Sequence, residues 1–229
     1  MPPNVNRNGK GGHMHNYSNL EVQGLKRRKE KTKENLLTDT EVDRLIEACQ
    51  GFKDRFMVSM LLYTGMRVSE FIHMRRGWID WEMGLIRTPE IQRCGCRECG
   101  RELKNRRGQI TKPPGVWKPK TFEAVRAIPI VPEVKGVLKE FFSKHEEVME
   151  LIPSRGAAYY RFKGIAGRAG IEHPVFPHVA RGTFATLLAR KGFNAFELMS
   201  TMGWKSIKTA EDYIKLSGSA VKQAFKEKW

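Results

Sequence analysis

Apolar residues recur at helical spacing along most of this chain, and the β-prone runs are confined to the stretch from residue 78 to residue 131. Thr38 and Glu41 have the Thr-x-x-Glu spacing of a capping box, which predicts the start of a helix with Leu45 on its inner face. The pattern predicts a helix after Thr38, a second over 54–64, a third ending at Met74, and then helices over 133–149, 155–169, 178–191, 195–202, 207–216 and 218–227.

The β-prone stretch predicts two small hairpins. Trp78 to Thr88 has β-prone runs on either side of a Glu-Met-Gly turn, and Val116–Lys120 is expected to pair with Val125–Val131. Residues 90–115 between them are interpreted as a loop insertion. The fold class predicted is α+β, mostly α, with a small antiparallel sheet. No βαβ alternation, GxGxxG or Walker phosphate loop occurs, which argues against nucleotide chemistry.

Composition fits one domain with an appended arm. Residues 1–35 are rich in Gly and Asn and then in charge, and they are interpreted as a flexible basic arm before a domain over 36–229. No apolar run reaches the length of a membrane span, and the N-terminus has no secretory signal pattern, so a cytoplasmic protein is expected. The net charge of +16 favours a polyanionic partner, first of all nucleic acid, because phosphates release counterions to clustered cations.

Five side chains in three short segments suggest a phosphodiester chemistry. Arg67 and Arg181 offer guanidinium groups that match phosphate oxygens, and His178 lies three residues before Arg181 on one predicted helix. Tyr213 supplies a phenol as nucleophile, Trp204 an indole N–H, and His178 a proton acceptor. Together these groups suit transesterification at a phosphate. The leaving 5′-oxygen needs a general acid as well, and a lysine on a hairpin could serve.

The segments that contain these residues resemble the catalytic domain of the tyrosine recombinases, the phage integrase family. TGMRVSE resembles the first arginine box, HVARGTFATLLARKG the HxxR box, and MGWKSIKTAEDYIKL the box that ends in the nucleophile. KTFEAVRAIPI resembles the hairpin with the catalytic lysine, which favours Lys120 over Lys118 or Lys112. The resemblance covers about residues 36–216.

The resemblance implies the role of each residue. Arg67 and Arg181 would clamp the scissile phosphate, His178 would handle the tyrosine proton, Trp204 would contact the phosphate, Lys120 would be the general acid, Tyr213 the nucleophile, and Glu70 an accessory group. It further implies double-stranded DNA as partner, a homo-tetramer on paired sites, and a reversible reaction that needs no cofactor or nucleotide.

The sequence departs from the family pattern in three places. Gly182 follows Arg181 where the family usually has His, and Ala180 replaces a larger apolar residue. Family members also usually have an N-terminal core-binding domain, whereas about 35 residues precede the catalytic region here. We therefore expect an excised catalytic domain or a short member of the family.

Cys94, Cys96 and Cys99 lie within six residues and suggest a structural zinc site that lacks a local fourth ligand. The candidates for that ligand are Cys49, His73 and His145. The alternative is a reduced, Arg-rich loop near DNA.

Other functions remain open at this level. They are a DNA-binding protein of the same fold without catalysis, a zinc-stabilised DNA-binding regulator, and a type IB topoisomerase-like activity. Finally, Ala220, Val221, Ala224 and Phe225 form an apolar stripe over 218–229, which predicts a terminal helix that docks on its own domain or on a neighbouring protomer.

Overall fold

The computed structural model describes residues 32–218 and 225–226, all within a unit spanning Lys31–Trp229. Its helices are α1 (Asp39–Glu47), α2 (Gly51–Tyr63), α3 (Val68–Ile72), α4 (Pro132–Phe142), α5 (Arg155–Arg168), α6 (Pro177–Arg190), α7 (Ala195–Met202) and α8 (Ile207–Ser217), with short 3-10 turns η2 (Thr32–Glu34), η3 (Arg76–Trp78), η4 (Phe122–Ala124) and η5 (Val148–Glu150). Its strands are β1 (Ile79–Asp80), β2 (Leu85–Arg87), β3 (Gln92–Arg93), β4 (Leu103–Lys104), β5 (Ile110–Lys112), β6 (Val116–Trp117) and β7 (Ala127–Pro129). The predicted class, mostly helical with small antiparallel sheets, is confirmed.

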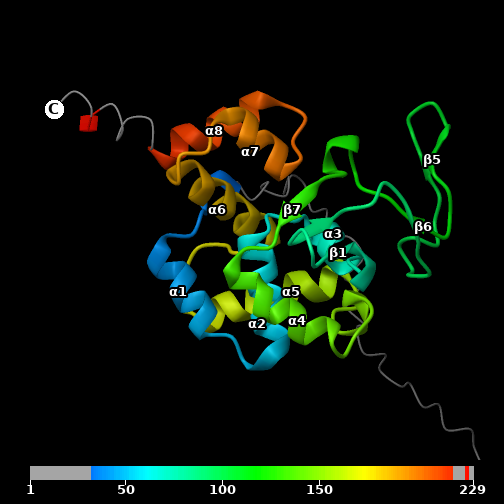
Figure 1. The fold of residues 1–229 in the computed structure, drawn as a ribbon, viewed down its shortest axis with the longest axis horizontal. Coiled ribbons are helices and arrows are strands. Elements are labelled where there is room, and N and C mark those ends of the chain that lie inside the picture. Colours follow the sequence, from blue (N-terminus) through cyan, green and yellow to red (C-terminus); the bar gives the residue numbers. More distant parts are fainter. Residues whose placement is uncertain (1–31, 219–224, 227–229) are drawn as a thin grey trace, which may run out of the picture. The chain divides into compact units, whose positions relative to one another are not determined.

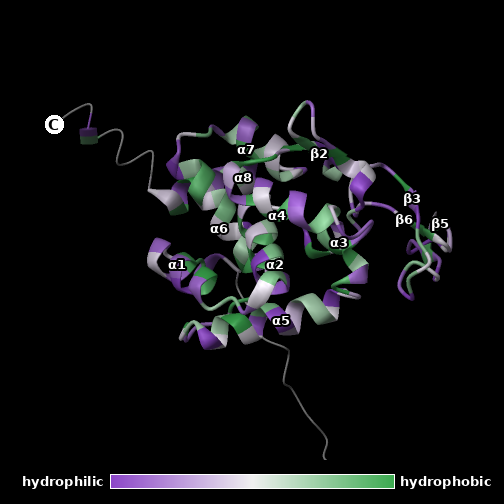
Figure 2. Cartoon of the chain, turned by 60° about the horizontal axis from the view of Figure 1, so that its bottom comes forward, coloured by the Kyte–Doolittle hydropathy of each residue, from purple (hydrophilic) through white to green (hydrophobic). Residues whose placement is uncertain are grey.

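The larger hydrophobic core is built around α2. Phe56 of this helix stacks on Phe141 of α4 with ring centroids 4.2 Å apart, and it also contacts Phe71 of α3. Figure 1 shows α2 in the middle of the helices, and in Figure 2 the outer helices α1 and α5 alternate hydrophilic and hydrophobic segments, as amphipathic helices do. The predicted capping box at Thr38 is present, since Thr38 and Glu41 each bond the other's backbone N–H.

A smaller core joins α6, α7 and α8. Phe184 and Leu188 of α6 are buried with Leu198 and Met202 of α7, and Tyr213 of α8 belongs to the same cluster. The first half of α6 is buried in the larger core instead. Because α6 belongs to both cores, its residues 178–182 are held firmly where the two meet.

The sheets confirm one predicted hairpin and overturn the other. β1 pairs with β2, as expected for Trp78 to Thr88, but β6 pairs with β3 and β7 with β2. The two halves of the predicted second hairpin therefore lie in different sheets. The reason is packing, since Trp117 of β6 is buried against Trp78, whereas Ile128 of β7 is buried opposite Ile86 of β2.

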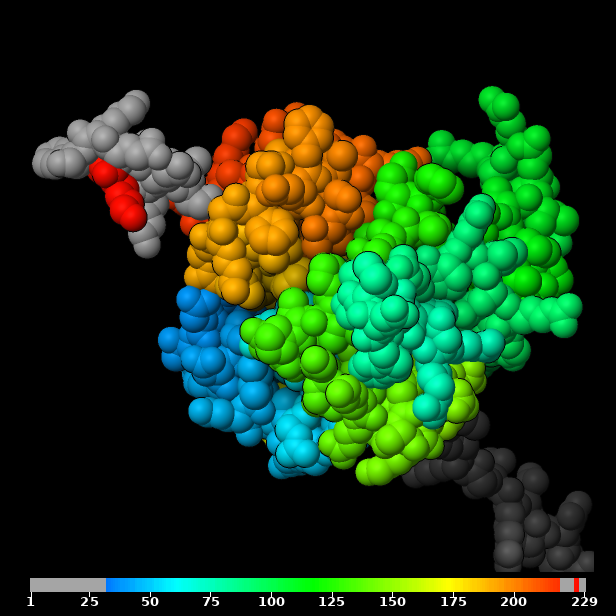
Figure 3. Space-filling model, in the orientation of Figure 1, coloured from blue at the N-terminus to red at the C-terminus, as the bar shows by residue number. Residues whose placement is uncertain are grey.

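The interpretation of 90–115 as a loop is wrong in part. β3 begins in this stretch, and β4 and β5 form a hairpin of their own within it. This hairpin projects from the edge of the helical part (Figures 1 and 3). Nearly every residue from 100 to 111 is exposed, so the hairpin offers its cations to a partner rather than to the core.

Two helices end earlier than predicted. α3 stops at Ile72 rather than Met74, and α4 stops at Phe142 because the chain beyond it turns back, where the carbonyl of Glu146 accepts from the amide of Arg76. No helix in the described ranges is long and apolar enough to cross a bilayer. Most of the predicted arm (1–31) and the apolar stripe of the predicted terminal helix, apart from Phe225, lie outside the described residues.

Candidate active site

Arg67 is the N-cap residue of α3. The turn before it needs glycine at position 65, where φ is +59° and a Cβ would lie 2.7 Å from the Phe184 ring. The guanidinium of Arg67 donates to the Glu70 carboxylate at 2.8 Å and to the carbonyl of Gly203 at 3.0 Å. Arg67 therefore links the start of α3 to the turn after α7.

Glu70 is a buried carboxylate shared by two arginines. It accepts from Arg67 and, at 3.1 Å, from Arg126, which also donates to the carbonyl of Thr201 at 2.8 Å. Burial alone would raise the pKa of Glu70, but the cations of Arg126, Arg181 and Arg67 outweigh it and hold that pKa below its usual value. Sequence reasoning missed Arg126, although it lies inside the quoted KTFEAVRAIPI segment.

Arg181 is buried one turn after His178 on α6. Its guanidinium donates to the carbonyls of Gly65 and Met202, which lie before α3 and at the end of α7. Burial, and then the nearby charge of Arg67, lower the pKa of Arg181 to about 9, so it keeps its charge at neutral pH. Two carbonyl partners leave further N–H donors of the guanidinium for an anion.

Tyr213 lies in the smaller core with its ring stacked on Trp204, centroids 5.1 Å apart and nearly parallel. The Arg181 guanidinium lies 5.9 Å from the centre of the Trp204 ring. Burial raises the pKa of the Tyr213 phenol; Arg181 opposes this rise and Asp212 adds to it. In the free protein, the effect of burial on the pKa of Tyr213 therefore outweighs that of Arg181.

Gly182 explains why a larger residue is absent next to Arg181. A Cβ at this position would lie 3.1 Å from the Tyr213 hydroxyl and 2.8 Å from the Leu36 side chain. The segment before α1 covers this point, because the Lys33 ammonium forms an ion pair with Asp212 at 2.6 Å and lies over the Tyr213 ring. Sequence reasoning missed Lys33, which nothing distinguishes from the other cations of the arm.

The side chains meet in two adjoining concavities. One, here called the tyrosine hollow, has a volume of about 250 Å³ and is lined by Lys33, Arg67, His178, Arg181, Trp204 and Tyr213. The other, here called the lysine cleft, has about 590 Å³ and is lined in part by Arg67, Glu70, His73, Lys118, Lys120 and His178. Arg67 and His178 line both. The structure thus gathers every residue predicted for catalysis around these two sites.

The lysines differ in what they bind. Lys112 is buried and its ammonium donates to the carbonyls of Cys99, Arg101 and Val116, so it is not free to act as an acid. Lys118 donates to the carbonyl of Thr111 at 3.2 Å. Lys120 is exposed between β6 and η4, and within the described ranges no hydrogen bond or ion pair ties its ammonium.

His178 is expected to resist protonation. Desolvation, and then the cations of Arg181, Arg67 and Lys120, lower the pKa of His178 below its ordinary 6.5. The unfolded chain then binds this proton more readily, so the contribution of His178 to stability falls as the pH drops below about 6.5.

Thermal unfolding of the wild type and of His178→Gln at pH 7 and pH 5.5 measures this difference. The melting temperature should fall more between pH 7 and pH 5.5 in the wild type than in the variant, because glutamine binds no proton in this range. An equal loss in both proteins would contradict the lowered pKa.

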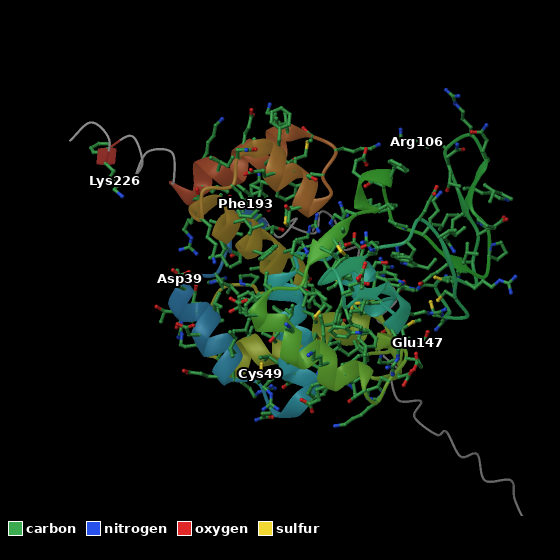
Figure 4. The ribbon with its side chains drawn as sticks, viewed as in Figure 1. Asp39, Cys49, Arg106, Glu147, Phe193 and Lys226 are labelled. Atoms are coloured by element: carbon green, nitrogen blue, oxygen red, sulfur yellow. The ribbon has the colours of Figure 1, made fainter. Side chains whose placement is uncertain are left out.

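The cysteine cluster gains its fourth member from α3. The ligand atoms of His73, Cys94, Cys96 and Cys99 all lie within 4.8 Å of one another. The other candidates lie elsewhere: His145 bonds Glu150, and Cys49 follows α1 on the side of the helices opposite to Arg106 of the β4–β5 hairpin (Figure 4).

Comparisons with known proteins give matches along most of this chain. The model of the phage integrase family matches residues 35–219. The chain is 27% identical over 181 residues to tyrosine recombinase XerA of Saccharolobus solfataricus, covering 79% of this chain and 52% of that protein. It is 26% identical over 177 residues to tyrosine recombinase XerD of Listeria monocytogenes, covering 77% and 54%. The chain thus spans about half the length of these relatives.

Solved structures show the same fold. A crystal structure of XerA recombinase superposes with a TM-score of 0.60 at 23% identity, over 84% of this chain and 62% of that one. The Tn1549 transposon integrase in complex with transposon right end DNA gives 0.58 at 21%, over 82% and 65%. The catalytic domain of bacteriophage HP1 integrase gives 0.54 at 21%, over 83% and 93%. A zinc-stabilised regulator or a topoisomerase finds no support in these comparisons.

Proposed function

Because the chain belongs to the phage integrase family, we propose that it is a site-specific DNA recombinase that cleaves and rejoins strands through a 3′-phosphotyrosine at Tyr213. The observation that supports this most is the tyrosine hollow, in which one phenol, one imidazole and two guanidinium groups from three separate segments face the same space. Each of these groups has a use in phosphoryl transfer, and the chemistry requires no cofactor.

In the proposed reaction, the Tyr213 oxygen attacks the scissile phosphorus and the bond to the 5′-oxygen breaks. Arg67 and Arg181 donate to the non-bridging oxygens, whose charge grows in the transition state, and Trp204 packs beside them. Both arginines are already oriented by backbone carbonyls and Glu70, so little reorganisation is needed when the phosphate binds.

Two groups manage the protons. His178, kept neutral by its surroundings, accepts the proton of the Tyr213 phenol. Lys120 then gives a proton to the leaving 5′-oxygen from the lysine cleft. The 5′-hydroxyl so formed can attack the phosphotyrosine in the reverse sense, which rejoins a strand without any outside source of energy.

The free protein must change before it cleaves. The raised pKa of Tyr213 disfavours the phenolate, and the Lys33–Asp212 ion pair closes one side of the hollow. Because this ion pair is exposed to solvent, which screens its charges, phosphate binding can displace it. DNA thereby opens the hollow that it enters.

A nicked suicide duplex tests the proposal. The duplex carries the target site, and the nick lets the short 5′ fragment diffuse away so that the covalent product accumulates. Denaturing electrophoresis should show a protein–DNA adduct, and mass spectrometry of its peptides should place the nucleotide on Tyr213. An adduct on another residue, or cleavage that leaves free phosphate ends, would refute the mechanism.

DNA binding should weaken steeply with salt. Each phosphate neutralised adds about −0.9 to the slope of log K against log salt, so six contacts cost about 10³-fold in affinity between 50 and 200 mM. The double variant Arg106→Gln/Arg107→Gln removes two exposed cations from the β4–β5 hairpin and should reduce the slope by about 2.

Fluorescence anisotropy with a labelled duplex measures these slopes. Lys139→Gln/Lys144→Gln removes the same charge from a surface that lines neither the hollow nor the cleft, and it should leave the slope unchanged. Equal effects of the two double variants would mean that the hairpin does not contact DNA.

We also infer that the active unit is a homo-tetramer on two paired DNA sites, held by the apolar stripe at residues 220–225. Deleting residues 218–229 should leave folding and single-site binding intact and abolish the multi-protomer complex in native electrophoresis. If the truncated chain unfolds as a monomer, the stripe instead packs on its own domain.

A further inference from the structure

The cluster of His73, Cys94, Cys96 and Cys99 contains none of the residues proposed to act on the phosphate, and the proposed reaction makes no use of it. The histidine ends α3, whereas the cysteines belong to the β3–β6 segment, so the cluster joins two parts that are far apart in sequence. We infer that these four side chains bind one structural zinc ion, which fixes the β3–β6 segment to α3.

The distances suit a single tetrahedral ion. The His73 Nε2 atom lies 3.5 Å from the Cys96 Sγ and 3.4 Å from the Cys99 Sγ. Zinc bound at its usual bond lengths separates a nitrogen and a sulfur ligand by about 3.6 Å and two sulfur ligands by about 3.8 Å. With all four ligand atoms within 4.8 Å, side-chain adjustments of about 1 Å bring them to one ion.

The histidine is oriented as a zinc ligand requires. Its Nδ1 donates to the carbonyl of Ser69 at 2.7 Å, which leaves the lone pair on Nε2 directed at the sulfurs. Trp117 stacks on the imidazole at 5.3 Å and donates its indole N–H to the Ser69 hydroxyl. These contacts hold the ring in one tautomer and one position before any ion binds.

The cysteine sulfurs are also arranged as zinc ligands require. The backbone N–H of Cys99 donates to the Cys96 Sγ at 3.4 Å, a contact that stabilises a thiolate. All the cysteines of the cluster are free thiols, and Cys94 and Cys99 are buried. Neutral thiols that are buried close together stabilise the fold little, whereas thiolates that bind a cation stabilise it strongly.

Lys112 provides an independent indication from charge. Its ammonium is buried and binds only carbonyl oxygens, one of them that of Cys99 at 3.0 Å, and no carboxylate in the described ranges pairs with it. A buried cation without a counter-ion is costly. Zinc with three thiolates and one imidazole has a net charge of −1, which supplies that counter-ion next to Lys112.

The position of the ion has a consequence for the lysine cleft. His73 and Cys99 line this cleft together with Lys120, which follows β6 by three residues. Zinc would therefore limit the movement of the segment that places Lys120 in the same cleft as Arg67. The ion itself binds no substrate in this proposal, since all four of its positions are filled by protein.

Metal content tests the site without any DNA. Tag-free protein made with zinc in the medium and purified with a reductant should contain about one zinc per chain by mass spectrometry of the metal. Cys96→Ser should contain less than about 0.1, and Cys49→Ser, which alters a half-buried thiol outside the cluster, should still contain about one. A zinc-free wild type, or equal loss in both variants, would overturn the proposal.

Cobalt exchange into the wild type covers the case in which Cys96→Ser fails to fold. Co²⁺ in a site of three thiolates and one imidazole should give intense tetrahedral bands in the visible and thiolate charge-transfer bands near the ultraviolet. Chelation of the metal should speed hydrogen exchange over residues 92–118 and leave α6–α8 unchanged. Absence of the cobalt bands, or a Cys96–Cys99 disulfide in reduced preparations, would overturn the site.

Discussion

Tyr213→Phe is expected to abolish the covalent protein–DNA adduct while DNA affinity stays within about twofold of the wild type. The substitution removes only the hydroxyl, and the ring keeps its stack on Trp204, so the smaller core should be intact. Loss of a nucleophile costs at least about 10⁴-fold in rate, which puts the adduct below detection in the suicide assay.

Tyr160→Phe is the matched control, because Tyr160 is 75% exposed and lines neither the hollow nor the cleft. It should cleave at the wild-type rate. An adduct that persists in Tyr213→Phe and vanishes in a variant of Tyr160, Tyr159 or Tyr63 would transfer the nucleophile to that residue. Loss of DNA binding in Tyr213→Phe would mean that the hydroxyl has a structural role instead.

The helical part of the fold was largely predictable from the sequence. Apolar periodicity gave the positions of α5, α6, α7 and α8 to within about a residue, because each buries one face in a core. The partners of short strands were not predictable in the same way. β6 and β7 each have only two or three residues, and their pairing depends on which buried side chain each one packs against, Trp78 for Trp117 and Ile86 for Ile128.

The candidate site likewise contains residues that the sequence predicted and others that it did not. Arg67, His178, Arg181 and Tyr213 were found because they occupy fixed places in three spaced motifs. Arg126 and Lys33 were not predicted from the sequence because their importance lies in contacts with Glu70 and Asp212, which only the fold creates. The choice of His73 over Cys49 and His145 as fourth member of the cysteine cluster likewise required coordinates, since all three are distant in sequence.

Lys120→Ala is expected to slow cleavage about 10²–10⁴-fold, the usual contribution of a general acid. Lys120 is the one of the three nearby lysines whose ammonium is free within the described ranges, and it shares the lysine cleft with Arg67 and His178. The substitution lies on an exposed side chain, so stability should change by less than about 0.5 kcal/mol.

A 5′-bridging phosphorothioate separates acid catalysis from positioning. Its sulfur leaves as a thiolate and needs no proton, so Lys120→Ala should cleave this substrate at nearly the wild-type rate. Lys118→Ala, whose ammonium normally donates to the Thr111 carbonyl, should cleave both substrates almost as fast as the wild type. If Lys118→Ala cleaves the normal substrate slowly and the phosphorothioate at the wild-type rate, Lys118 is the general acid. If Lys120→Ala remains slow on the phosphorothioate, Lys120 holds the DNA in place rather than protonating the leaving oxygen. The reason is that the sulfur substrate can compensate only for a missing proton donor, not for a loss of positioning.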